Sequence, residues 1–122
     1  MATAPKPGGN NAPTYSVLKI TVRGETTIVD PGDFGPKDDI MVRKESLAAF
    51  GERMSLMGAF HEIDERSAGT DTICLLWWIG RRKAGETNES LSDALDSFPT
   101  YAEMAQGAYT AEVVEPEDDS GN

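Results

Sequence analysis

Metal-ligating side chains are scarce in this sequence. His61 is the only histidine among 122 residues, and Asp64 and Glu65 follow it at helical spacing. In a helix these three side chains would share one face, because residues three and four positions apart are neighbours. One histidine beside carboxylates is common on solvated helix faces, so we expect neither a metal site nor a cofactor.

The usual catalytic groups are also nearly absent. Cys74 is the only cysteine, so the chain can form no internal disulfide and no cysteine-rich metal site. It lies in an apolar run, where a small buried hydrophobic residue is a better interpretation than a nucleophile. The sequence has no phosphate loop, no dinucleotide fingerprint and no diagnostic serine–histidine–acid pattern. We therefore expect no catalytic residue and no enzymatic activity.

Three consecutive cations at residues 81–83 could contact phosphate groups. The whole chain, however, carries a net charge of −10, and this field repels nucleic-acid backbones. Cations in the last turn of a helix are also explained by the helix dipole, whose negative end they complement. We expect no nucleic-acid binding, although an acidic protein of this kind could imitate DNA.

The cations follow seven consecutive apolar side chains at residues 73–79, with two adjacent tryptophans in the middle. No apolar run approaches the roughly 20 residues that span a bilayer, so we expect no membrane segment. Thr70 or Asp71 can cap a helix that takes in residues 73–83. Gly85 is well placed to end this helix in the left-handed conformation.

This tryptophan helix has two interpretations. It can be the central core helix of a small domain, or it can place one tryptophan in the core and the other in an interface with an oligomer or partner, where tryptophan is enriched. Methionines on neighbouring helical positions can fill the core or adapt to an irregular partner. The residues that we predict to contact a partner are Trp77, Trp78, Leu75 and Ile79, with Met54 and Met57 as secondary candidates.

The N-terminal part of the chain predicts a β-hairpin. Apolar residues alternate with others through "YSVLKITV", which is the period of a half-buried strand. The β-branched run "TTIV" follows after a short loop in which Gly24 can supply the positive φ of the turn. The prolines and glycines of "DPGDFGP" then end the second strand.

Helices are predicted for most of the remaining chain. Between residues 38 and 65 we expect one broken helix or two shorter ones, with Asp38 or Asp39 as the cap. Their expected buried stripe consists of Ile40, Leu47, Phe50, Met54 and Met57. Beyond the tryptophan helix, we expect a short helix capped by Asn88 and a last helix that starts at Thr100 and covers residues 101–109.

These signals together predict a small α+β fold, in which an N-terminal β-hairpin packs on a mainly helical bundle. Residues 1–14 hold three prolines and few large apolar side chains, so we expect a flexible arm. Residues 15–111 form the single expected domain. Residues 112–122 contain five acidic residues and no cation, and we expect an acidic flexible tail there. The N-terminus lacks the pattern of a secretory signal, which favours an intracellular protein.

The order of these features resembles the tail assembly chaperones of long-tailed, siphovirus-type bacteriophages, particularly those that infect actinobacteria. The phrase "LLWWIGRRKAGE", followed by "SLSDALD", carries most of the resemblance. Family members often have a tryptophan-containing helix that ends in basic residues, then a short loop and an acidic–apolar segment. They also often begin with a short β-pair. The resemblance covers roughly residues 16–115.

The resemblance implies a non-enzymatic protein that binds the hydrophobic, helical tape-measure protein and helps to deliver tail tube subunits. Such chaperones act in the host cytoplasm during assembly and are absent from finished virions, and a longer form is commonly made by translational frameshifting. An acidic body with an apolar surface could cover apolar stripes of a long helix and lend it charge. Formation of a homo-oligomer would add avidity along the tape measure.

Two other functions fit the same sequence. A structural virion component, such as a head–tail connector or a tail-completion protein, would remain in purified particles. An acidic inhibitor that mimics DNA would need carboxylates spaced like phosphates on a rigid surface. Half of the net charge lies in the expected tail, which makes rigid mimicry the weaker alternative.

Overall fold

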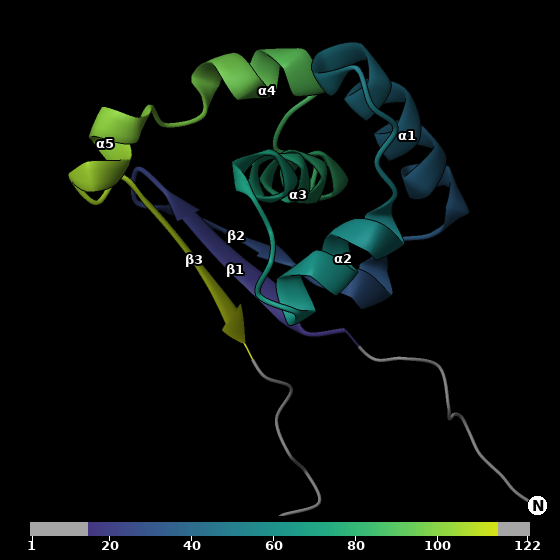
Figure 1. The fold of residues 1–122 in the computed structure, drawn as a ribbon, viewed down its shortest axis with the longest axis horizontal. Helices are drawn as coiled ribbons and strands as arrows, with labels where there is room; N and C mark the ends of the chain where they lie inside the picture. Colours follow the sequence, from purple (N-terminus) through teal and green to yellow (C-terminus); the bar gives the residue numbers. More distant parts are fainter. Residues whose placement is uncertain (1–14, 115–122) are drawn as a thin grey trace, which may run out of the picture.

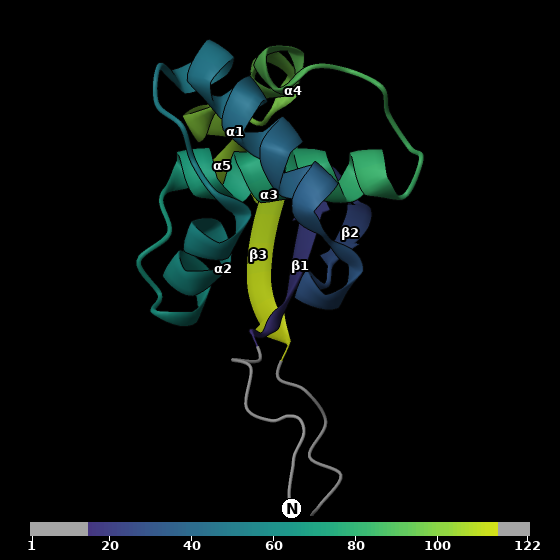
Figure 2. The same ribbon diagram turned by 90° about the vertical axis from the view of Figure 1, so that its right-hand side faces the viewer.

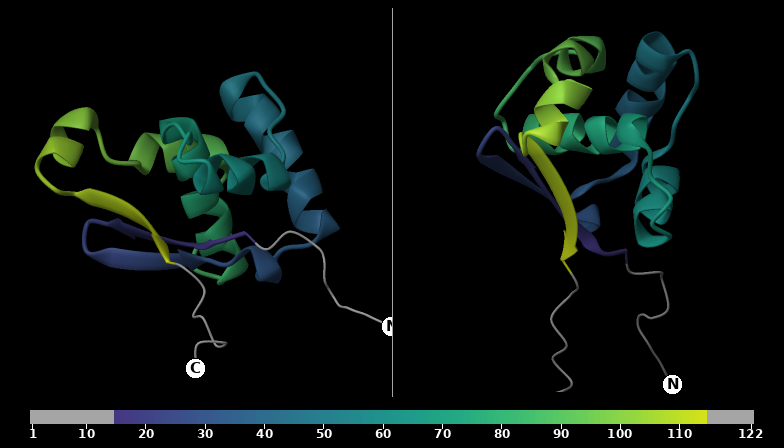
Figure 3. Two further views of the ribbon diagram at one scale, coloured as in Figure 1. Left: turned by 60° about the horizontal axis from the view of Figure 1, so that its bottom comes forward. Right: turned by 60° about the vertical axis from the view of Figure 1, so that its left-hand side comes forward.

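The structure is a computed structural model and describes residues 15–114. A three-stranded antiparallel sheet in the order β2-β1-β3 carries the helices on one side (Figures 1 and 3). The expected α+β class is confirmed. In chain order the elements are β1 (Val17–Val22), β2 (Glu25–Val29), the 3-10 turn η1 (Pro31–Asp33), α1 (Pro36–Phe50), α2 (Leu56–Asp64), α3 (Thr70–Lys83), α4 (Leu91–Ser97), α5 (Tyr101–Ala105) and β3 (Tyr109–Val114).

The predicted hairpin is formed by β1 and β2. Val22 pairs with Glu25 across a two-residue turn. Arg23 and Gly24 occupy this turn with φ values of 49° and 86°. Positive φ at both central residues is the geometry whose twist matches two antiparallel strands. Glycine adopts it easily, whereas Arg23 adopts it at some cost in backbone strain.

The third strand corrects the predicted boundaries of the domain. β3 pairs with β1 along its whole length, from Tyr109 opposite Val22 to Val114 opposite Val17. Residues 112–114 therefore belong to the sheet and not to the expected acidic tail, and the last helix ends at Ala105 instead of residue 109. The sequence did not predict this strand, because it is short and its hydrogen-bond partner, β1, is far away in the chain. The expected arm at 1–14 and the rest of the tail lie outside the described residues.

Helix α3 is the centre of the molecule. Figure 1 views it end-on, enclosed by the sheet, α1, α2 and α4, and Figure 2 shows α1 crossing it. Every residue from Thr72 to Gly80 is buried, and Gly69, not Thr70 or Asp71, occupies the N-cap position. A Cβ atom on Gly80 would lie 3.0 Å from methyl groups of both Thr27 and Val29. The glycine thus lets α3 lie directly against β2.

The predicted apolar stripe between residues 38 and 65 is only partly buried: Phe50 and Met54 pack against the core, but the other three residues do not. Ile40 and Leu47 on α1 are 66% and 44% exposed, and Met57 on α2 is 61% exposed. The residues of α1 that are fully buried are Val42 and Ser46. The Ser46 hydroxyl accepts a hydrogen bond from the Met54 N–H at 2.8 Å. A hydrophobic pattern misses this face because one of its buried residues is a hydrogen-bonded serine.

The two short helices near the C-terminus start at hydroxyl caps. Ser90, and not the predicted Asn88, caps α4 by accepting a hydrogen bond from the Asp93 N–H. Thr100 caps α5 as predicted, and Glu103 completes a capping box with it. None of the helices within residues 15–114 is long and apolar enough to cross a membrane.

Candidate partner-binding groove

The tryptophan helix presents little surface to a partner. Leu75, Trp77, Trp78 and Ile79 are between 0% and 5% exposed. The Trp78 indole donates a hydrogen bond of 2.8 Å to the backbone carbonyl of Glu89. In the described residues of this one chain these four predicted contact residues lie in the core, which matches the core-helix interpretation of the sequence.

The cations that follow the tryptophans also have partners inside the domain. Arg81 lies 4.6 Å from the centre of the Trp77 ring and 2.9 Å from a carboxylate oxygen of Glu89. Arg82 donates to the backbone carbonyl of Glu89 at 3.3 Å. Lys83 forms an ion pair of 3.0 Å with Asp38 at the start of α1. The two arginines thus anchor the loop after α3, and Lys83 joins the end of α3 to α1, which is a sufficient structural role for the basic triplet.

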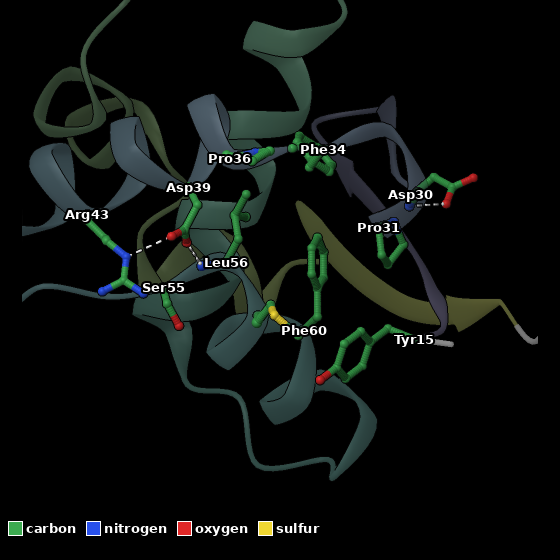
Figure 4. A pocket seen from close by; sticks show the side chains of 13 residues that line it. Tyr15, Asp30, Pro31, Phe34, Pro36, Asp39, Arg43, Ser55, Leu56 and Phe60 are labelled. Atoms are coloured by element: carbon green, nitrogen blue, oxygen red, sulfur yellow. Dashed lines mark hydrogen bonds and ion pairs between the residues drawn. The ribbon is translucent and has the colours of Figure 1, made fainter. Parts of the chain in front are cut away.

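An open apolar groove lies elsewhere, between α2 on one side and η1 with the start of α1 on the other. It has a volume of about 720 Å³ and is largely lined by apolar side chains (Figure 4). A volume of this size is typical of sites that bind small ligands or anchoring side chains. Its lining residues are Tyr15, Asp30, Pro31, Gly32, Phe34, Gly35, Pro36, Asp39, Arg43, Ser55, Leu56, Met57 and Phe60.

Phe60 is the centre of an aromatic group in this groove. Its ring centroid lies 5.9 Å from that of Phe34 and 6.1 Å from that of Tyr15. Phe60 itself is buried, whereas Phe34 and Tyr15 are half-buried and present part of their rings. Aromatic rings held in contact give an apolar surface that loses little conformational entropy when a partner binds.

A charged pair closes one end of the groove. Asp39 accepts a hydrogen bond of 2.7 Å from Arg43 Nε with one oxygen and one of 2.8 Å from the Leu56 N–H with the other. Partial burial raises the pKa of Asp39, but these hydrogen bonds and the Arg43 charge together lower it below 3.8. The ionised carboxylate thus joins α1 to the start of α2 and fixes the width of the groove.

Two of the predicted contact residues lie on α2 or just before it. Met57 lines the groove and is exposed, whereas Met54 is half-buried and packs against the core. Ile40 on α1 is 66% exposed but does not line the groove. Met57 is therefore the one candidate, among the six named from the sequence, that combines exposure with a place in the groove.

The three possible metal ligands do not form one cluster. His61 Nε2 lies 3.0 Å from Glu65, and both side chains are more than half exposed. Asp64 instead accepts a hydrogen bond from the Ser16 N–H. No group of three potential metal ligands occurs within residues 15–114.

Burial, followed by the charges of Glu89 and Asp71, raises the pKa of the Cys74 thiol to about 12 and suppresses its reactivity.

Sequence reasoning missed the aromatic residues of the groove. Phe34 was part of a segment interpreted only as a strand end, and Phe60 was not assigned to any face. A signal was present, because a phenylalanine between glycines in a loop has no helix or strand of its own to pack it. The distance between Phe34 and Phe60 in the chain hid their contact.

This arrangement offers an apolar surface for a partner's side chains, bounded by carboxylates and one arginine. Comparison of the chain with protein-family models, curated proteins and solved structures found no match.

Proposed function

We propose that this protein is a tail assembly chaperone that binds the tape-measure protein of a long-tailed bacteriophage and assists assembly of the tail tube. The observation that carries the proposal is the open aromatic groove with exposed Met57 on its wall. The resemblance in "LLWWIGRRKAGE" supplies the class of partner, whereas the groove supplies a surface to which that partner can bind.

The physical chemistry of the groove suits an apolar helical partner. Side chains from one stripe of a helix can lie on Phe34, Tyr15 and Met57, and methionine adapts to irregular shapes. The chain's net charge of −10 would keep such a complex soluble while apolar contacts hold it together. In this proposal the protein acts in the host cytoplasm and leaves before the virion is complete.

Co-expression with the tape-measure protein tests the proposal. We expect the wild-type chain to raise the soluble fraction of the tape measure and to co-purify with it. Met57→Glu places a charge on the groove wall and should abolish both effects. Ile28→Glu is the matched control, because Ile28 is 54% exposed on the sheet, outside the groove. If the tape measure stays equally insoluble with and without the wild-type chain, the proposal is wrong.

Analysis of purified virions distinguishes the chaperone from a structural virion component. Mass spectrometry of finished particles should detect the tail tube subunit but not this chain. Stoichiometric amounts of the chain in washed particles would instead support a connector or tail-completion role.

A further inference from the structure

The outer edge of β3 carries backbone groups that have no strand beside them within residues 15–114. The Arg23 N–H donates a hydrogen bond of 2.8 Å to the carbonyl of Ala108, which sets the pattern of the β1–β3 ladder. Since alternate residues of an antiparallel strand bond to the same side, Thr110, Glu112 and Val114 face β1. The N–H and C=O groups of Tyr109, Ala111 and Val113 therefore point away from the sheet.

A groove with a mixed polar and apolar lining runs beside this free edge. The side chains of Tyr109, Ala111 and Val113 are half-buried on the helix-covered face of the sheet. They line a groove of about 300 Å³ together with Leu18, Ile63, Arg66, Ala68, Gly69, Thr70 and Ile73. A strand added at the edge would thus find backbone partners along β3 and a partly apolar floor for its inward side chains. Main-chain hydrogen bonds and contacts for alternate side chains are what strand addition requires.

We propose that the outer edge of β3 pairs with β3 of a second copy, antiparallel, with Ala111 opposite Ala111 on the two-fold axis. In this register Tyr109 of each copy lies opposite Val113 of the other copy. Tyr109, Ala111 and Val113 then each exchange two backbone hydrogen bonds with the residue opposite. The two three-stranded sheets become one continuous sheet. Such an interface is self-complementary, as a two-fold dimer requires.

The side chains favour this register over its neighbours. On the helix-covered face, tyrosine meets valine, and aromatic–β-branched pairs stabilise sheets. On the open face, Glu112 lies between Lys19 of its own β1 and Thr110 of the second copy. Moving the two-fold axis one residue toward the C-terminus would place Glu112 opposite Glu112, which is unfavourable. Moving it one residue toward the N-terminus would leave Val113 without a partner.

The pairing edge and the groove described above share no lining residue. Each subunit of the dimer would therefore keep its own groove open. The β2 edge is a weaker candidate, because by the same alternation it directs only Thr26 and Ile28 outward. The inference does not depend on the identity of the partner in the aromatic groove.

Cysteine cross-linking tests the register directly. In the proposed dimer the two Cα atoms of residue 111 lie about 5.5 Å apart, within disulfide range. The purified full chain with Ala111→Cys should give a disulfide-linked dimer on mild oxidation. Cys74 does not interfere, because it is fully buried. Val114→Cys is the matched control on the same strand, since its two copies would lie roughly 20 Å apart.

The mass in solution provides the second measurement. We expect the wild-type chain to sediment at twice its 13.2 kDa at high concentration. Ala111→Pro removes an N–H that points outward and leaves the ladder to β1 intact, so it should give a folded monomer by circular dichroism. The inference is overturned if the wild type stays monomeric up to high micromolar concentration. Equal cross-linking through residues 111 and 114 would also overturn it.

Discussion

Helix α3 and the aromatic groove differ in how far their apolar residues are buried. The groove wall carries Met57 at 61% exposure, whereas the far more hydrophobic α3 buries Trp78 completely. The strongest apolar signal in the sequence marks the core, because a helix that is apolar on most sides must be surrounded. The exposed apolar surface instead comes from scattered residues that folding brings together. Local hydrophobicity therefore locates the core of this molecule better than it locates the apolar surface that stays exposed.

The largest expected effect on stability follows from a substitution in the buried helix α3. Trp78→Ala should lower the free energy of unfolding by about 3–5 kcal/mol, because it leaves a cavity and removes the donor to the Glu89 carbonyl. Met57→Ala on the exposed groove wall should change it by no more than about 0.5 kcal/mol. Urea denaturation followed by circular dichroism measures both. Similar losses in the two variants would mean that Met57 is also part of the core.

A smaller effect is expected where α3 touches the sheet. Gly80→Val adds atoms against Thr27 and Val29, where even a Cβ atom would be only 3.0 Å away. We expect a loss of about 1–3 kcal/mol in the free energy of unfolding, since the helix must move away from β2. Thermal denaturation would reveal the change as a lower midpoint. An unchanged midpoint would show that the sheet can adjust to the extra volume.

The smallest effect concerns the link that sets the groove width. Asp39→Ala removes the acceptor of the Leu56 N–H and should cost about 1 kcal/mol, because the carboxylate is partly exposed. The pKa of Asp39 is lowered in the folded state, so its contribution is present above pH 3.8 and is lost as the pH falls through the folded-state value. Acid titration of wild type and variant, compared by circular dichroism, measures the difference. If the stability of wild type and variant fell with pH in the same way, Asp39 would not have the stabilising role given to it here.

Local signals were sufficient where neighbouring residues determine the structure. The basic last turn of α3 and its termination near Gly85 follow from dipole and backbone preferences within a few residues. The Gly24 turn and the Thr100 cap were predicted for similar reasons. The choice of buried face on α1 failed, because Ser46 is buried through a hydrogen bond to Met54, eight residues away.

The sequence by itself determined the α+β class, the existence of the tryptophan helix, the hairpin and the scarcity of catalytic groups. Each of these depends on composition or on contacts between near neighbours in the chain. Only the tertiary structure decided that β3 completes the sheet, that Phe34 meets Phe60, and that Met57 is left exposed. These features join segments far apart in the sequence, and the free energy of such contacts depends on which surfaces the completed core leaves open.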